Sequence, residues 1–307
     1  MATKPVLPAP SFAVVAPRQS ASASSWSDYW ALTKPEINLL IAITTAVAFC
    51  MAAPSSLSSF PWISLLNSVL GTMLVASGAA TLNQWMERRF DAQMRRTARR
   101  PIAGGRIEPG RALAFGWLLS LVGVGYLVVT ANALAAVLAA MTLASYLFMY
   151  TPLKRRTSFC TLVGAIPGAM PPLIGWAAAR GSVSAEAWLL FAIVFLWQFP
   201  HFMAIAWMYR EDYDRAGYKV LPHGRARVPI VIVQTVLPLF ALVCVTLLQA
   251  LRGTAGVLYT GGLVLLGLGF LTCGLQFVSK RSGSSARRLL FASILYLPPV
   301  FLLLSLG

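Results

Sequence analysis

Charged residues are confined to a few short segments of this chain, and long uncharged stretches separate them. Each uncharged stretch is rich in apolar residues and is long enough for one or two membrane-spanning helices, each of which needs roughly 20 apolar residues. The pattern therefore predicts an all-α protein that crosses the membrane many times. The uncharged stretches are 37–86, 112–153, 157–179, 187–209, 228–251, 253–279 and 289–307.

The two longest stretches hold two spans each, because turn-forming residues interrupt them at Ala53–Ser56 and at Thr130–Asn132. The other five stretches hold one span each, and the total is nine transmembrane helices. The predicted spans are 39–53, 62–85, 113–129, 133–150, 158–178, 187–208, 229–250, 257–278 and 289–306.

Composition supports a membrane protein, and the distribution of charge predicts its orientation. Hydrophobic residues make up 58% of the 307 residues and charged residues only 11%, whereas about a quarter of a soluble domain is charged. With nine spans, all but two of the 25 Lys and Arg residues fall on the side of the N-terminus, and only Arg180 and Arg252 fall on the other. The positive-inside rule therefore places the N-terminus in the cytoplasm. The net charge of +16 belongs to one membrane face and does not indicate nucleic-acid binding.

The first 27 residues differ from the rest of the chain. They are rich in Ala, Ser and Pro and are predicted to be disordered, which leaves residues 28–307 as a single intramembrane domain. The segment has no compact apolar run like that of a secretory signal, and it has fewer arginines than a mitochondrial presequence. A bacterial inner membrane is therefore expected, with the mitochondrial inner membrane as the alternative.

Three oxygen-bearing side chains follow the second predicted span at intervals of four residues. Asn83, Glu87 and Asp91 would share one face of a helix at the membrane edge. Carboxylate and amide oxygens suit Mg²⁺, and Mg²⁺ suits a phosphate. The alternative is an amphipathic helix end whose acids pair with neighbouring arginines. Acids beside a membrane are usually functional, which favours the metal site.

Basic residues close to these acids are candidates for binding a diphosphate. Arg96 and Arg100 are also four residues apart, and their forked guanidinium groups match phosphate oxygens. Lys154 follows the fourth span and is a further phosphate candidate. The competing interpretations are that the arginines only set topology and that Lys154 only anchors the helix at the membrane interface.

Two later segments carry further candidate residues. Glu211, Asp212 and Asp214 follow the sixth span. They are consecutive or nearly so and cannot all face one point on a helix, so one or two of them would complete a cation site. His201 lies inside the sixth span, four residues after Trp197. An intramembrane His is rarely idle, so it is interpreted either as a contact to a large substrate or an iron ligand, or as a structural residue bonded to a neighbouring helix.

Taken in order along the chain, these segments resemble the UbiA-type intramembrane prenyltransferase superfamily, and within it most closely the haem-farnesylating branch. The first acidic motif of the superfamily, N-x-x-x-D-x-x-x-D, matches Asn83 and Asp91 with Glu87 in the middle place. The R-T-x-x-R-P element matches Arg96 to Pro101. The resemblance covers Thr33–Ile37, the first acidic loop, Tyr150–Arg156, Gly164–Trp176 and Trp197–Pro222.

The second acidic motif of the superfamily is not intact here. Tyr209 and Tyr213 stand where acids are expected, and Asp212 is one place away. The resemblance therefore implies Asp212 as the fourth catalytic and metal-binding residue beside Asn83, Glu87 and Asp91. It also implies that nine helices surround a central cavity under a cap of cytoplasmic loops.

The resemblance implies a specific reaction and specific partners. A farnesyl group would pass from farnesyl diphosphate to the vinyl group of haem B and give haem O, for use in a terminal oxidase. Mg²⁺ is the implied cofactor, Arg96, Arg100 and Lys154 would bind the diphosphate, and His201 and Trp197 would contact haem. The lipid bilayer and a downstream haem-modifying enzyme are the expected partners.

Two other functions compete with this one. A prenyltransferase acting on a quinone precursor would share the diphosphate site and differ only in its acceptor. A transporter or channel would need charged residues deep within its spans, and the uncharged stretches offer none.

Overall fold

The computed structural model describes residues 25–54, 56–222, 224, 227–252 and 257–306, and within them the regular structure is entirely helical. In this part of the chain nine spans are long and apolar enough to cross a membrane, which confirms the predicted architecture. The spans are α2 (Pro35–Ala52), α3 (Trp62–Asp91), α4 (Pro109–Thr130), α5 (Ala133–Ala144) continued by η2 (Ser145–Tyr150) and α6 (Thr151–Leu153), α7 (Cys160–Arg180), α8 (Ala185–Met208), α10 (Arg227–Arg252), α11 (Val257–Lys280) and α12 (Gly283–Leu306).

Three short helices complete the structure: α1 (Trp26–Leu32), the 3₁₀ turn η1 (Leu57–Ser59) and α9 (Arg210–Arg215). Sequence periodicity did not predict α1. It begins with a capping box in which the Ser25 and Asp28 side chains satisfy free backbone N–H groups. The predicted disordered segment 1–27 lies outside the described residues except for its last three, of which Trp26 and Ser27 already belong to this helix.

Several spans are longer than predicted, because charged residues at their ends do not stop the helices. α3 continues from the predicted end at 85 to Asp91, so the whole acidic motif belongs to one unbroken helix. α12 begins at Gly283 instead of 289 and includes Arg287 and Arg288, whose long side chains can reach toward the membrane surface. α2 begins four residues early at Pro35, a residue that suits the first turn of a helix.

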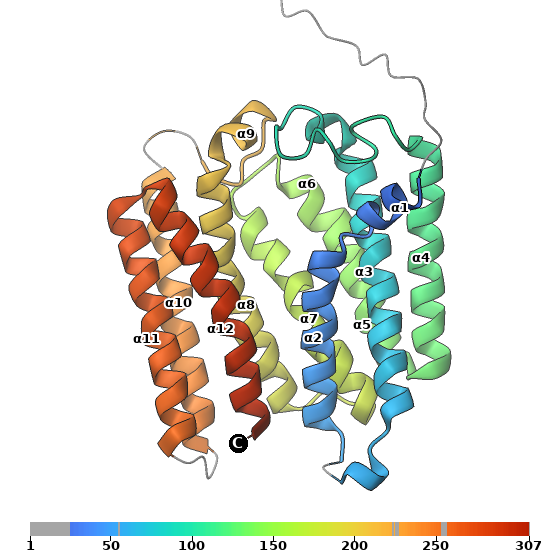
Figure 1. Cartoon of the computed structure of the whole chain (residues 1–307), viewed down its shortest axis with the longest axis vertical. Helices are drawn as coiled ribbons and strands as arrows, with labels where there is room; N and C mark the ends of the chain where they lie inside the picture. Colours follow the sequence, from blue (N-terminus) through green and yellow to red (C-terminus); the bar gives the residue numbers. More distant parts are fainter. Residues whose placement is uncertain (1–24, 55, 223, 225–226, 253–256, 307) are drawn as a thin grey trace, which may run out of the picture.

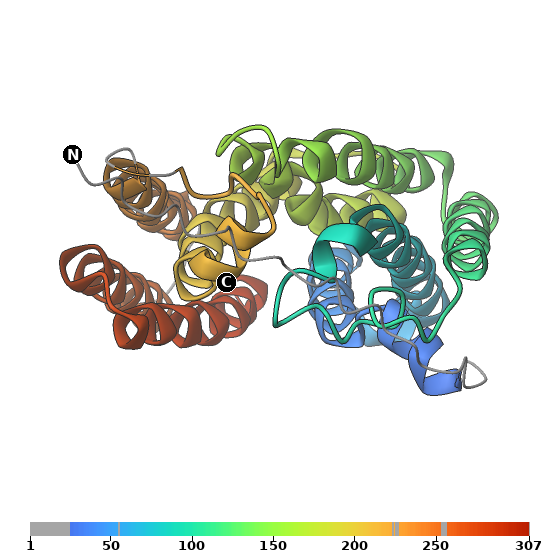
Figure 2. The ribbon, with the colours of Figure 1, turned by 90° about the horizontal axis from the view of Figure 1, so that it is seen from above.

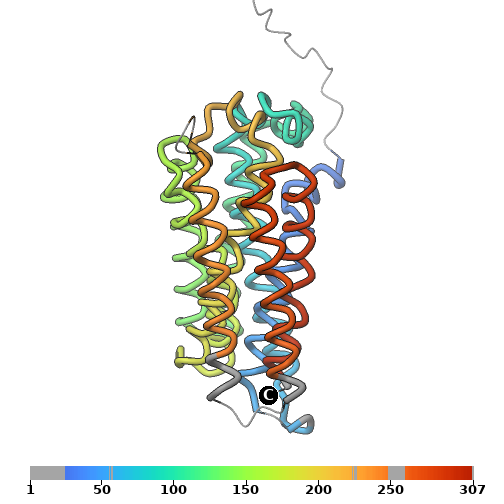
Figure 3. The backbone as a smooth tube through the Cα atoms, turned by 90° about the vertical axis from the view of Figure 1, so that its left-hand side faces the viewer, coloured from blue at the N-terminus to red at the C-terminus, as the bar shows by residue number. Residues whose placement is uncertain are grey.

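The helices run side by side in an elongated bundle (Figures 1 and 3). Figure 2 shows α4 at one edge of the bundle and α11 at the other, with α7 and α8 between them. α11 packs on both α10 and α12, and these two helices in turn pack on α8. The loop 92–108, α1 and α9 gather at one end of the bundle, whereas the last turn of α12 lies at the opposite end (Figure 1).

α7 is the central helix, and most of its residues are buried. It packs on α2, α5 and α8. The approach to α2 is so close that a Cβ atom on Gly175 would overlap the backbone carbonyl of Thr45. Small residues allow this contact, which is the usual means of helix packing in membranes.

Candidate active site

A cavity of about 690 Å³ lies inside the bundle, within the usual range for a ligand pocket. Residues of α2, α3, α5, η2, α7, α8 and α12 line its walls. Its roof is the polar cap, here defined as residues 92–108 and 209–222, from which Met94, Arg96, Tyr213 and Tyr218 reach the cavity. Polar side chains face the cavity near the cap, whereas Ile, Leu, Ala and Pro dominate its deeper part. The cavity is therefore polar at one end and apolar at the other.

The acidic motif of α3 faces the polar end of the cavity. Asn83, Glu87 and Asp91 all line the cavity, and they are only 1%, 6% and 1% exposed. They share one face because successive members lie four residues apart on a continuous helix. The structure thus confirms the prediction that these three side chains share one face of the helix.

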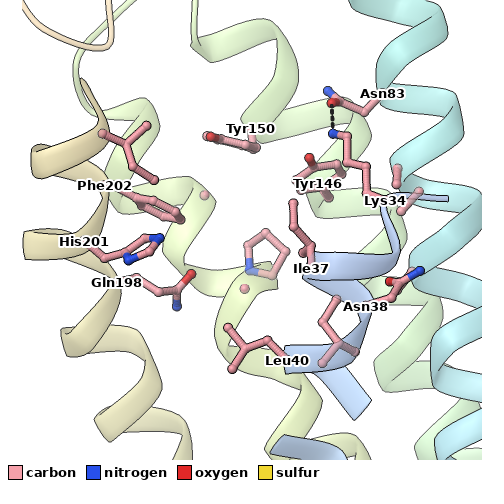
Figure 4. Close-up of a pocket in the computed structure, with 18 of the residues that line it drawn as sticks. Lys34, Ile37, Asn38, Leu40, Asn83, Tyr146, Tyr150, Gln198, His201 and Phe202 are labelled. Carbon is pink, nitrogen blue, oxygen red and sulfur yellow. Dashed lines mark hydrogen bonds between the residues drawn. The ribbon is translucent and has the colours of Figure 1, made fainter. Parts of the chain in front are cut away.

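Each of these side chains contacts a cation that lies far from it along the chain or in the next loop. Lys154 donates to both carboxylate oxygens of Glu87, at 2.9 and 3.0 Å. Arg100 donates to both oxygens of Asp91, at 2.8 Å each. The ammonium group of Lys34 lies 3.4 Å from the amide oxygen of Asn83 (Figure 4).

The two lysines respond differently to the charges around them. Burial, together with the positive charges of Arg100 and Lys154, lowers the pKa of Lys34 from 10.5 to about 7. Burial alone would also lower the pKa of Lys154, but the adjacent Glu87 carboxylate raises it well above its usual value. Lys154 is therefore fully charged at neutral pH. An anion beside Lys34 raises the pKa of its ammonium group and so favours its charged form.

The two long loops converge on the cavity. Met94 of the first loop packs with Ala216 and Tyr218 of the second. Arg96 donates to the Tyr213 hydroxyl at 3.3 Å, and its guanidinium lies over the Tyr209 ring at 4.8 Å. The polar cap is thus one packed unit in which both loops contribute to the site.

The acids of the second loop do not line the cavity in this structure. Asp212 accepts a hydrogen bond from Arg215 at 3.2 Å, and Glu211 is 78% exposed. Asp214 pairs with Arg227 at 3.0 Å. In the short helix α9, Tyr213 lines the cavity. Asp212 is one position earlier, so its side chain lies on a different side of the helix and does not line the cavity.

The sixth span contributes Trp197, Gln198 and His201 to the deeper part of the cavity. The predicted haem contacts therefore share one helix face. Across the cavity, α7 has glycines at the two points where Tyr150 and Gln198 approach it. A Cβ atom on Gly164 would overlap the Tyr150 ring, and a Cβ atom on Gly168 would overlap the Gln198 amide. The small residues of α7 leave room for side chains that enter the cavity.

Sequence reasoning gave no role to Lys34 or to Tyr218. Lys34 precedes Pro35, and its backbone has φ 51°, a left-handed conformation at the start of α2 that points the side chain toward Asn83. The feature of the sequence that could have identified Lys34 is its position directly before the first span. Burial and the nearby Glu87 raise the pKa of the Tyr218 hydroxyl, which stays neutral and can only donate or accept hydrogen bonds.

The α3 face is suited to a hard divalent cation that is shared with a phosphate. In the part of the chain that the structure describes, no three His, Cys, Asp or Glu side chains come together as an all-protein metal cage. Mg²⁺ does not need such a cage, because it commonly binds one or two carboxylates together with waters and substrate phosphates. Glu87, Asp91 and the Asn83 oxygen form a donor set of this kind, with cations beside it to neutralise the phosphate.

Comparison with known proteins identifies the family of the chain. The UbiA prenyltransferase family matches residues 41–295. A protoheme IX farnesyltransferase from Solibacter usitatus is 49% identical over 280 residues, which cover 89% of this chain and 96% of that protein. Another protein of the same name, from Salinibacter ruber, is 44% identical and covers 90% of this chain and 97% of its own.

Solved structures share the fold at much lower identity. A digeranylgeranylglyceryl phosphate synthase superposes with a TM-score of 0.73 at 15% identity, over 92% of this chain and 97% of that one. A UbiA homolog from Archaeoglobus fulgidus, bound to GPP and Mg²⁺, has a TM-score of 0.62 at 14% identity, over 91% and 99%. The chain is a multi-pass membrane enzyme and belongs to the UbiA prenyltransferase family.

Proposed function

We propose that this protein transfers the farnesyl group of farnesyl diphosphate to a vinyl group of haem B and so forms haem O. The name shared by the bacterial relatives supports this acceptor and this prenyl donor. The observation that carries the proposal is the polar end of the cavity, where three buried oxygen donors and their cations adjoin a large apolar chamber. A diphosphate with a long apolar tail matches both parts.

The diphosphate would lie between the α3 face and the cations above it. Arg96, Arg100 and Lys154 are the proposed partners of its oxygens, and Lys34 joins them because its ammonium lies in the same cavity. Asn83, Glu87 and Asp91 would hold Mg²⁺, which neutralises the leaving group when it is bound. The Mg²⁺-bound structure of the Archaeoglobus homolog supports this use of metal in the family.

Asp212 remains the proposed contribution of the second loop to the metal site. In this structure its carboxylate pairs with Arg215, and its side chain is 12% exposed. Tyr213 beside it lines the cavity. The Asp212 proposal therefore requires the carboxylate to exchange Arg215 for the cation.

The chemistry follows from the division of the cavity. The cations stabilise the negative charge that develops as the allylic C–O bond breaks, and the apolar chamber keeps water from the farnesyl cation. The terminal carbon of the haem vinyl group supplies its π electrons to form the new C–C bond. Water adds to the remaining carbocation and loses a proton, so the products are haem O and diphosphate. Tyr146 and Tyr150 line the same cavity, and aromatic rings of this kind can stabilise a cation.

The proposed setting is the inner membrane of a bacterium, with the polar cap and the N-terminus in the cytoplasm. The organisms of the curated relatives are bacteria. The strongly basic loops support this orientation through the positive-inside rule. A downstream haem-modifying enzyme is the proposed recipient of the product.

Mass spectrometry of the haem tests the proposal. The purified protein in lipid is incubated with farnesyl diphosphate, haem B and Mg²⁺, and the extracted haem should gain the mass of one farnesyl group plus one hydroxyl. Parallel reactions replace haem with a phenolic quinone precursor or add a chelator. Prenylation of the phenol with none of haem would overturn the acceptor assignment, and full activity under chelation would overturn the metal assignment.

A further inference from the structure

The orientation of His201 is fixed by a residue that the proposed chemistry does not use. His201 projects from α8 into the deeper part of the cavity, between Gln198 and Phe202 (Figure 4). Its Nδ1 atom lies 2.8 Å from the Ser293 hydroxyl of α12. On its other side the ring stacks on Trp197, with 4.9 Å between centroids and 26° between planes. The imidazole is therefore held both by a hydrogen bond and by an aromatic face.

The hydrogen-bond network determines which nitrogen of His201 carries the proton. A serine hydroxyl has one hydrogen to donate and two lone pairs to accept with. Ser293 Oγ donates its hydrogen to the backbone oxygen of Leu290 at 2.6 Å. It can then only accept from His201, so Nδ1 carries the hydrogen, and the neutral ring keeps a lone pair on Nε2. This assignment rests on the network, as it does for any histidine seen without hydrogens.

Nε2 is left free to bind a ligand in the cavity. Within the described residues the ring makes no other hydrogen bond. Ser293 is completely buried, and its backbone oxygen also accepts from the Trp197 indole N–H at 2.7 Å. One residue of α12 thus holds both of the α8 rings, and it holds Trp197 through its backbone and His201 through its side chain.

We propose that Ser293 is a positioning residue that fixes His201 as the Nδ1–H tautomer, so that Nε2 binds the iron of the substrate haem. The inference rests on the proposed function, because it takes haem as the acceptor. Histidine is a common axial ligand of haem, and ligating histidines usually donate their other N–H to an oxygen, which raises their basicity. Ligation would hold the porphyrin in one place so that a vinyl group faces the prenyl cation.

Haem titration of a His201→Gly variant tests the ligand. Ferric haem is added to the wild-type protein and to the variant, and the Soret band and the electron paramagnetic resonance spectrum are recorded. The wild type should give the spectrum of histidine-ligated haem. The variant should lose it and recover it when free imidazole is added. An identical spectrum in the wild type and in the variant without imidazole would overturn the iron-ligand assignment.

Ser293→Ala isolates the hydroxyl from the packing, because the bond from Trp197 goes to the backbone and survives the substitution. After reduction of the haem, the iron–histidine stretching frequency should fall, and haem affinity should drop by about tenfold, as for losses of other partners of metal ligands. Ser293→Thr should restore the frequency. Ser305→Ala, on the exposed end of the same helix, should behave as the wild type. An unchanged frequency in Ser293→Ala would refute the positioning role.

The farnesyl-transfer assay separates this inference from the proposed function. If the wild type farnesylates haem while the His201→Gly spectrum is unchanged, the function stands and the iron ligand is wrong. If the wild type binds haem with a His201-dependent spectrum but transfers farnesyl only to another acceptor, the ligand stands and the haem farnesylation is wrong.

Discussion

At the scale of single residues, the polar end of the cavity is a set of charges that neutralise one another. Removing charges from water is costly, so buried charges need partners. Glu87 and Asp91 find them in Lys154 and Arg100, whose side chains are 13% and 24% exposed. A diphosphate and its metal would take over both sets of partners, since the cations could turn to the phosphate and the acids to the metal. In the proposed function, the resting ion pairs would thus keep the site ready for a highly charged substrate.

Asp91→Asn should lower farnesyl transfer by about 100-fold, the order of magnitude for loss of one preorganised electrostatic contact. The amide keeps the shape of the side chain but removes the charge that a metal requires. The measurement is initial rate against Mg²⁺ concentration in lipid. Glu108→Gln is a matched control, because Glu108 and its partner Arg111 are 68% and 67% exposed. Equal rates in Asp91→Asn and in the wild type would exclude Asp91 from the metal site.

Two neighbouring acids test the part played by the second loop. Asp212→Asn should lower the rate by about tenfold or more if its carboxylate reaches the metal, since one preorganised contact is worth at least that much. Glu211→Gln should change little, because the Glu211 side chain is 78% exposed and lies 3.8 Å from Arg210. Steady-state rates with saturating farnesyl diphosphate distinguish the two variants. If both behave alike, Asp212 does not belong to the site.

At the scale of elements, the fourth span changes its helix type where its side chains reach the cavity. The span changes from α-helix to the π-helix η2 at Ser145–Tyr150, and the Thr151 hydroxyl donates to the backbone oxygen of Tyr146 at 2.9 Å. π-helical turns occur often at functional sites, where the added residue shifts the register of the helix beyond them. Here Tyr146, Tyr150 and Lys154 all line the cavity, and Lys154 reaches Glu87 on α3.

The contact between α3 and α4 should tolerate no added volume. A Cβ on Gly78 would overlap the Ser120 hydroxyl and lie 2.7 Å from the Gly116 backbone oxygen, which cannot move aside easily. Gly78→Ala should therefore destabilise the protein by about 1–3 kcal/mol and shift α3. Gly125→Ala on α4 meets no atom within 4 Å and should be neutral or slightly stabilising.

Thermal unfolding in detergent measures both glycine variants. A lower midpoint is expected for Gly78→Ala and an unchanged or higher one for Gly125→Ala. The same midpoint shift in both would mean that the α3–α4 contact does not limit stability.

At the scale of the whole molecule, the two ends of the bundle differ in charge and its sides are apolar. Exposed arginines such as Arg89, Arg95, Arg99 and Arg156 lie at or near the polar cap. The outer face of α4 exposes Leu118, Leu121 and Val129 to 59%, 66% and 84%. Side chains of that kind suit contact with lipid tails, and the charged end suits the membrane surface.

A reporter enzyme that is active only outside the cytoplasm tests the orientation. Fused to the C-terminus, it should be active, because α12 ends on the face opposite α1 and the polar cap (Figure 1). Inserted after Gly104 in the polar cap, it should be inactive. The reverse pattern of activities would invert the proposed topology.

Part of the arrangement at the polar end of the cavity could be predicted from the sequence. The spacing of Asn83, Glu87 and Asp91 is a local property of one helix, so it predicts their common face. Arg100 as the partner of Asp91 comes from the next loop, and one competing interpretation of the motif already paired its acids with arginines. Lys34 lies 49 residues before Asn83 and Lys154 lies 67 residues after Glu87, so only packing of α2, α3 and η2 could show that they meet.

The number of spans, the basic face and the α3 motif could all be predicted from the order of residues, because hydrophobic length, charge and helical period are properties of neighbouring residues. Which side chains face the cavity depended on the packed structure. It paired Lys154 with Glu87, turned Tyr213 inward in place of Asp212, and set His201 against Ser293, 92 residues away. These contacts depend on how the helices pack and rotate against one another. The distances between helices are set in part by small residues such as Gly175, which contact helices that are distant in the sequence.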